Sequence, residues 1–177
     1  MARQQVILVD KNNRVKGFEE KIKTHKEGKL HRAFSIFIFN SKEELLIQQR
    51  AKTKYHSGGL WSNTVCSHPK PNETYQRAVH RRLREEMGFD CKLKKIFCFV
   101  YTANLQNGLI ENEYDCVFIG KFDGKPKPDP GEIMDCEWIS IKELKKRISS
   151  NPNSFSVWLK IALERITNIQ IKEVLKW

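Results

Sequence analysis

The order of apolar and polar positions along the chain predicts short strands separated by turns, with one strongly amphipathic helix between them. Apolar runs bounded by turn-forming residues predict strands over residues 6–9, 33–39, 45–49, 94–102, 110–122 and 133–139. Apolar residues at four-residue spacing, Val79, Leu83 and Met87, predict a helix that ends at Gly88. We expect Asn72 to cap the N-terminus of this helix.

Two further helices are predicted near the C-terminal end of the sequence. Ser140 and Glu143 form a capping box that opens a helix over residues 141–148, and Ser154 is a candidate cap for a helix over residues 155–166. Strands and helices that intermix around a mixed sheet are typical of the α/β (α+β) class. A chain of 177 residues supports one substantial core, so we expect a single domain over residues 1–177.

The charge of the chain needs an explanation, because 32 Lys and Arg residues against 21 Asp and Glu residues give a formal net charge of +11. A solvated basic surface, a nucleic acid and a phosphorylated ligand would each account for it. No aromatic-rich RNA-binding signature, Cys/His finger or arginine-rich tail supports nucleic acid. No apolar run has the length of a secretory signal or a membrane span, so we expect a cytoplasmic protein with no membrane partner.

The cysteines are scattered at positions 66, 91, 98, 116 and 136, with no CxxC pair. An odd number of cysteines without metal-ligand spacing favours reduced thiols, most of them small core residues. Cys66 differs from the others because it lies in a polar, Gly-rich loop two residues before His68. A reactive role competes here with that of an ordinary buried thiol.

Acidic residues mark two more candidate sites in the sequence. Glu86 lies beside Leu83 at the edge of the apolar stripe, where a carboxylate needs a partner. Glu111, Glu113 and Asp115 alternate along one predicted strand, so they share a face that is either solvated or directed at a cation.

Basic residues mark two further candidate sites in the sequence. His25 and His31 lie in a lysine-rich segment and are surface residues unless the neighbouring strand draws them inward. Arg50, Lys52 and Lys54 enter the Gly-rich loop, where they are either solvated or suited to a phosphate.

The predicted helix fits most of the Nudix box, G-x5-E-x7-R-E-U-x-E-E-x-G-U, where U is aliphatic. Glu73, Arg81 and Glu85 match, whereas Ser67 replaces the first glycine and Arg82 replaces the first glutamate of the R-E-U run. The preceding loop, WSNTVCSHP, resembles the cysteine loop of type I isopentenyl-diphosphate isomerases, which share the Nudix fold. Three more motifs of that family are present in order: a histidine pair at 25 and 31, ENE at 111–113 and F-S-x-W at 155–158.

This resemblance implies a mixed β-sheet sandwiched between helices, and the conversion of isopentenyl diphosphate to dimethylallyl diphosphate by a 1,3-allylic proton shift. It implies that Cys66 and Glu113 transfer protons, that Tyr101 hydrogen-bonds Glu113, and that Trp158 faces the developing cation. The implied ligands of one Mn²⁺, Zn²⁺ or Mg²⁺ are His25, His31, His68, Glu111 and Glu113.

The resemblance also implies a site for the substrate's diphosphate. A Mg²⁺ that arrives with the diphosphate would be held by Glu86 and the Cys66 carbonyl. The implied phosphate contacts are Lys21, Arg50, Lys54 and Arg82.

Two other functions compete with the isomerase. One is a Nudix pyrophosphohydrolase of a nucleoside diphosphate derivative, and the other is a basic nucleic-acid-binding module. Neither requires Cys66, the ENE segment and both histidines together. We therefore expect an isomerase of a small prenyl diphosphate, with no nucleic-acid partner, as a monomer or weak homodimer.

Overall fold

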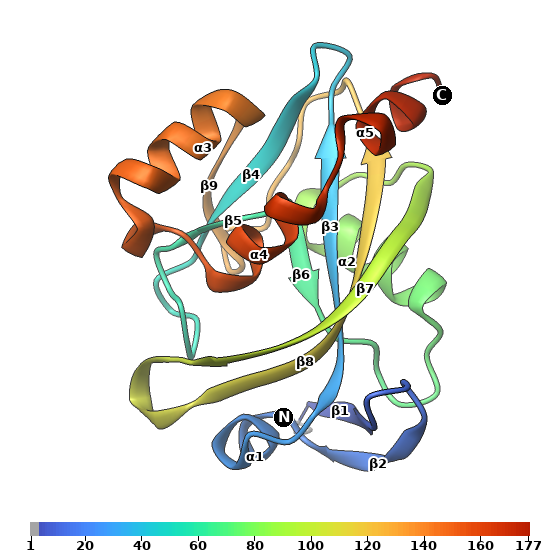
Figure 1. Cartoon of the computed structure of the whole chain (residues 1–177), viewed down its shortest axis with the longest axis vertical. Helices are drawn as coiled ribbons and strands as arrows, with labels where there is room; N and C mark the ends of the chain where they lie inside the picture. Colours follow the sequence, from blue (N-terminus) through green and yellow to red (C-terminus); the bar gives the residue numbers. More distant parts are fainter. Residues whose placement is uncertain (1–3) are drawn as a thin grey trace.

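A mixed sheet organises residues 4–177, which are the residues that the computed structural model describes (Figure 1). Its strands are β1 (Gln5–Val9), β2 (Val15–Glu20), β3 (His31–Phe39), β4 (Glu44–Arg50), β5 (Trp61–Ser62), β6 (Val65–Ser67), β7 (Leu93–Asn104), β8 (Ile110–Lys121) and β9 (Ile133–Ser140). The helices are α1 (Lys21–Glu27), α2 (Tyr75–Met87), α3 (Ile141–Ser150), α4 (Val157–Arg165) and α5 (Asn168–Leu175). The predicted fold class is confirmed. The predicted single domain includes residues 1–3, which lie outside the described range, and stays a prediction.

Strand β3 lies at the centre of the sheet. It pairs with β8 in parallel and with β6 antiparallel, while β7 extends the sheet beyond β8. Because side chains alternate along a strand, Phe34 and Ile36 face one side, whereas Ser35 and Phe37 face the other. The almost uninterrupted apolar sequence of β3 fits this position, since both of its faces are covered.

The two faces carry separate apolar cores. Helix α2 packs its predicted stripe, including Val79 and Leu83, against Phe34, Ile36 and their neighbours. Helices α4 and α5 pack against Phe37 and the other residues of the opposite face, so α2 and α4 lie on opposite sides of β3 (Figure 1). The expected sandwich of helices around a mixed sheet is therefore present.

Several helix ends differ from those that the sequence predicts. Helix α2 begins at Tyr75 with Thr74 as its N-cap, whereas Asn72 adopts a left-handed conformation with φ of 62°. Ser156 takes the N-cap position of α4, because Ser154 lies in a short 3-10 turn over Pro152–Ser154. Helices α1 and α5 are additional to those that the sequence predicts.

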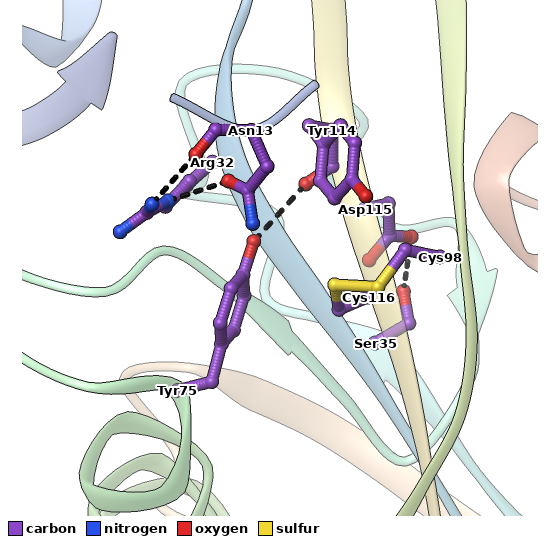
Figure 2. The surroundings of a disulfide bond; sticks show 8 residues. All are labelled: Asn13, Arg32, Ser35, Tyr75, Cys98, Tyr114, Asp115 and Cys116. Carbon is purple, nitrogen blue, oxygen red and sulfur yellow. Dashed lines mark hydrogen bonds between the residues drawn. A yellow bond between two sulfur atoms is a disulfide. The ribbon is translucent and has the colours of Figure 1, made fainter. Parts of the chain in front are cut away.

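The expectation that all cysteines are reduced is wrong for two of them. Cys98 and Cys116 form a disulfide that links β7 to β8 (Figure 2). These residues are directly opposite in the β7–β8 register and face the α2 side of the sheet. The pairing depends on which strands become neighbours, and the spacing of cysteines in the sequence carries no such information. Cys66, Cys91 and Cys136 remain free.

Among the described residues, no helix combines the length and the apolar character needed to cross a membrane.

The burial of the α2 stripe gives a stability prediction. Leu83 is fully buried, so Leu83→Ala should lower the free energy of unfolding by about 2–5 kcal/mol through lost apolar contact and a residual cavity. Ile169 on α5 is 72% exposed, so Ile169→Ala should change it by less than about 0.5 kcal/mol. Urea denaturation measures both variants. Equal losses would contradict the assignment of Leu83 to the core.

Candidate active site

One face of three adjacent strands brings the predicted chemistry together. In the sheet register, His31 on β3 is opposite Glu113 on β8, and Ser35 on β3 is opposite Cys66 on β6. Directly paired residues point to the same face of a sheet, so Cys66 and Glu113 share the face on either side of β3. The acidic residues of β8 are therefore directed inward, and the alternative of a solvated face is wrong.

A cluster of imidazoles and a carboxylate lies at one end of this face. His25, His31, His68 and Glu113 each offer one ligand atom, and these atoms lie within 4.8 Å of one another. The His68 Nε2 atom is 3.2 Å from His31 Nε2 and 3.0 Å from Glu113 Oε1. All four residues are buried, which corrects the expectation that His25 and His31 taken alone are surface residues.

The hydrogen bonds of the imidazoles indicate that the cluster suits a cation. The Nδ1 atom of His25 is 2.8 Å from the Lys21 carbonyl, and Nδ1 of His31 is 2.8 Å from the Lys29 carbonyl. A carbonyl only accepts, so both Nδ1 atoms carry hydrogen and both Nε2 lone pairs point into the cluster. Burial lowers the pKa of His25 to about 4, so its ring is a neutral imidazole of the kind that binds metal.

Glu111 adds a second carboxylate beside the first. The Tyr101 hydroxyl is 3.0 Å from Glu111 Oε2 and 2.7 Å from Glu113 Oε2, and it has one hydrogen to donate. Burial raises the pKa of Glu111 well above its usual range, and the neighbouring Glu113 raises it further. A divalent cation between the two carboxylates would offset this repulsion. The residues present therefore fit the metal site that the sequence predicts, without selecting the metal.

The next acidic residue along β8 has a different role. Asp115 accepts a 2.8 Å hydrogen bond from Ser35 Oγ on β3 (Figure 2). Burial raises its pKa to about 8, and Glu113 contributes in the same direction. This bond holds β3 and β8 together next to Glu113.

A pocket opens beside the cluster. Its lining includes Cys66, Glu111, Glu113, Lys21, Arg50, His56 and Trp158. Burial raises the pKa of the Cys66 thiol to about 11, so the sulfur carries its proton at neutral pH. Arg50 Nη1 donates to Cys66 Sγ at 3.5 Å, and the Arg50 guanidinium lies 5.4 Å from the centre of the Trp158 ring.

The predicted phosphate contacts divide into two pairs. Lys21 and Arg50 line the pocket, and burial lowers the pKa of Lys21 to about 8, with Arg50 and Lys54 contributing. Lys54 and Arg82 form ion pairs with Glu132 and are not part of the lining.

Comparison with known proteins agrees with this geometry. Residues 29–159 match the family model described as NUDIX domain. Isopentenyl-diphosphate Delta-isomerase 2 of Aromatoleum aromaticum is 52% identical over 92% of this chain and 86% of its own length. The enzyme of the same name from Photorhabdus laumondii is 48% identical over 95% of each chain. The chain belongs to the isopentenyl-diphosphate Delta-isomerase family of Nudix proteins.

Solved structures support the fold alone. The crystal structure of a protein from Deinococcus radiodurans has a TM-score of 0.77 at 22% identity and covers 92% of this isomerase-family chain and 98% of its own. A MutT protein from Methanosarcina mazei has a TM-score of 0.64 at 18% identity, over 77% of this chain and 91% of its own.

The apolar stripe of α2, the Nudix helix of this isomerase-family chain, packs on the face opposite the pocket residues of the strands. Burial raises the pKa of Cys66, and the charge of Glu86 is near enough to raise it further. The Glu86 carboxylate is buried, and Oε1 accepts from Arg82 Nε at 3.0 Å and Nη2 at 2.6 Å. Gln48 Nε2 is 3.4 Å from Oε2. The predicted need of Glu86 for a partner is thus met by Arg82, the residue that departs from the box. Glu73, which matches the box, pairs with Arg81 through two bonds of 2.7 and 2.8 Å.

Sequence reasoning missed Tyr55 and His56. Both lie in the loop after β4, where the only signals were an aromatic residue and a histidine within a Gly-rich segment. Tyr55 OH is 3.4 Å from His25 Nε2, and the His56 ring is edge-on to Trp158. Burial lowers the pKa of His56 to about 2, with Arg50 contributing, so this ring is also neutral.

The cluster gives a metal-binding prediction. His31→Ala removes an inward Nε2 and should weaken Mn²⁺ binding by more than about tenfold. Loss of a residue that only hydrogen-bonds to a metal ligand already weakens metal affinity by about that factor. Free Mn²⁺ is measured by electron paramagnetic resonance during titration of metal-free protein. His80, which bonds Asp90 and Gln76 on the surface, supplies the control His80→Ala. Equal affinities of the two variants would count against a cation at His31.

Proposed function

We propose that this chain converts isopentenyl diphosphate to dimethylallyl diphosphate in the pocket between Cys66 and Glu113. The observation that carries the proposal is the common position of these two side chains. They belong to strands on either side of β3, share one face of the sheet and line the same pocket with Trp158. The Nudix pyrophosphohydrolase alternative has less support, because the family relatives are isomerases by name.

The reaction sets clear demands on the site. A proton is added to the terminal alkene carbon, positive charge develops at the tertiary carbon, and a proton leaves the carbon on the other side. An unactivated alkene is a poor base, so the acid must be positioned and water must be excluded. Cys66 and Glu113 are the two proton-transfer groups, and Tyr101, which bonds both Glu111 and Glu113, assists transfer at Glu113.

The aromatic wall of the pocket suits a cationic intermediate. Trp158 is buried, and the guanidinium of Arg50 already lies over its ring. A ring face stabilises a nearby cation by about 0.5–2 kcal/mol. We infer that Arg50 binds the diphosphate at the mouth while Trp158 faces the isoprenoid part.

The metal site serves Glu113. His25, His31, His68, Glu111 and Glu113 would hold Mn²⁺, Zn²⁺ or Mg²⁺, an oxygen and nitrogen set that suits each of them. When bound, the cation supplies positive charge that fixes the Glu113 carboxylate and adjusts its acidity. Glu113 and Tyr101 then hold and move the proton at the alkene.

The diphosphate requires separate neutralisation. Lys21 and Arg50 line the pocket, and Lys54 and Arg82 would join them by exchanging their ion pairs with Glu132 for phosphate oxygens. A Mg²⁺ that accompanies the substrate would be held by Glu86 and the Cys66 carbonyl and would supply positive charge to the diphosphate. The absence of a nucleic-acid partner stays a prediction. A monomer or weak homodimer stays a prediction.

Removal of the thiol tests the chemistry. Cys66→Ala should lower kcat by about 10²–10⁴, the usual contribution of a positioned proton-transfer group, while Mn²⁺ affinity and melting temperature stay unchanged. Cys91 is a free cysteine outside the pocket lining, so Cys91→Ala should keep full activity. Deuterium incorporation into the prenyl product in D₂O measures turnover. Near-normal turnover by Cys66→Ala would remove Cys66 from the mechanism. Phosphate release from nucleoside diphosphate derivatives would favour the hydrolase.

The low pKa of Lys21 predicts a pH dependence. Burial lowers this pKa to about 8, so the ammonium is present below that pH and is lost as the pH rises through it. Loss of one charge-assisted phosphate contact should lower kcat/KM by about tenfold above pH 8. In Lys21→Arg the guanidinium stays charged, and the fall should move to higher pH. Identical pH profiles of kcat/KM for the two proteins would contradict the role of Lys21.

A further inference from the structure

His56 is a buried histidine that has no part in the proton transfer, metal binding or phosphate binding proposed so far. It lies in the loop after β4, where its carbonyl accepts from Arg50 Nη2 at 3.3 Å and its Nδ1 is 3.2 Å from Ser57 Oγ. The ring packs at 5.7 Å from the His25 ring, nearly parallel to it. These contacts hold the His56 ring in place, so its remaining nitrogen, Nε2, points in one direction.

That nitrogen faces the acidic side of the cluster. His56 Nε2 is 3.7 Å from Glu111 Oε1, which is too long for a hydrogen bond and close to the separation of two ligands on one cation. His25, His56 and Glu111 each offer one ligand atom, all within 4.8 Å of one another. They form a second donor set that overlaps the first, His25–His31–His68–Glu113, at His25.

The shared residue limits how the two sets are used. His25 Nδ1 donates to the Lys21 carbonyl, so His25 has a single lone pair, on Nε2, to offer. One nitrogen lone pair binds one metal ion. The two donor sets therefore cannot each use His25 at the same moment.

We propose that His56 is a fourth histidine ligand, which gives one divalent cation a second, overlapping position at His25, His56 and Glu111. This inference rests on the metal site of the proposed function and is independent of whether the pocket isomerises a prenyl diphosphate. The first set has more donors and is the tighter position. The second holds the cation when the first is weakened, and it uses the Glu111 oxygen that faces His56.

The competing explanation gives His56 no contact with the metal. In that case its ring would only orient Glu111, and its removal would weaken metal binding by the same factor whatever else had been changed. Two alternative positions behave differently. Loss of the weaker position matters little while the tighter one is intact, and matters greatly once the tighter one is lost.

A double-mutant cycle separates these explanations, with Mn²⁺ affinity of the metal-free protein as the readout. His56→Ala should weaken Mn²⁺ binding by less than about threefold in the wild-type background and by more than about tenfold in the His31→Ala background. The stoichiometry of the wild-type protein should be one Mn²⁺ per chain. His80→Ala is the control in both backgrounds and should change neither affinity, since its ring bonds only surface groups.

Each other outcome overturns the proposal. An equal factor in both backgrounds assigns His56 the orienting role alone, no effect in either assigns it none, and two Mn²⁺ per chain contradicts the shared ligand. If His56→Ala lowers the melting temperature, His56→Gln keeps a polar side chain of similar reach and enters the same cycle. Failure of the wild-type protein to bind Mn²⁺ would sink the metal site itself, whereas absent isomerase activity with the expected cycle would sink only the proposed function.

Discussion

The arrangement depends on one electrostatic constraint, the burial of two carboxylates side by side. Glu111 and Glu113 share a single donated hydrogen from Tyr101, and Glu113 also accepts from His68 Nε2, whereas His25 and His31 direct lone pairs into the cluster. Such a group is costly in a protein interior unless a cation completes it. The surrounding structure fits this need, because His31 and Glu113 are held opposite each other by the pairing of β3 with β8.

The sheet separates the Nudix helix, on one face, from the proton-transfer candidates, on the other. Helix α2 supplies its apolar stripe to the core on its own side, and Glu86 on it is held by Arg82. The proton-transfer candidates lie on the other face, under α4 with Trp158. Arg82, at the position of a box carboxylate, pairs with Glu85 and Glu86, so this helix departs from the Nudix box at a charged position, and the resemblance of the fold does not carry the chemistry with it.

Much of the structure follows from local sequence, and the exceptions have physical causes. The apolar stripe of α2 can be predicted because apolar spacing is a local property. The N-cap of α2 is Thr74 and not the predicted Asn72, because Asn72 adopts a left-handed conformation. The pairing of Cys98 with Cys116 and the inward position of His56 depend on which segments become neighbours in space. His25 could be predicted as a metal ligand only from the family resemblance, because nothing in its lysine-rich segment indicates that the side chain is buried.

The parallel pairing of β3 with β8 also determines where this chain can change its length. A strand's side chains alternate, so a single inserted or deleted residue between positions 111 and 117 would turn every later side chain of β8 to the opposite face. Glu113 and Val117 could not both keep their sides. The turn at residues 105–109, which joins β7 to β8, is outside this pairing, and its exposed residues 106–108 are where the chain can lengthen without changing the register. Length variation among functional relatives should therefore concentrate in that turn, and shuffling of segments within the family would preserve activity only when its junctions avoid the paired strands.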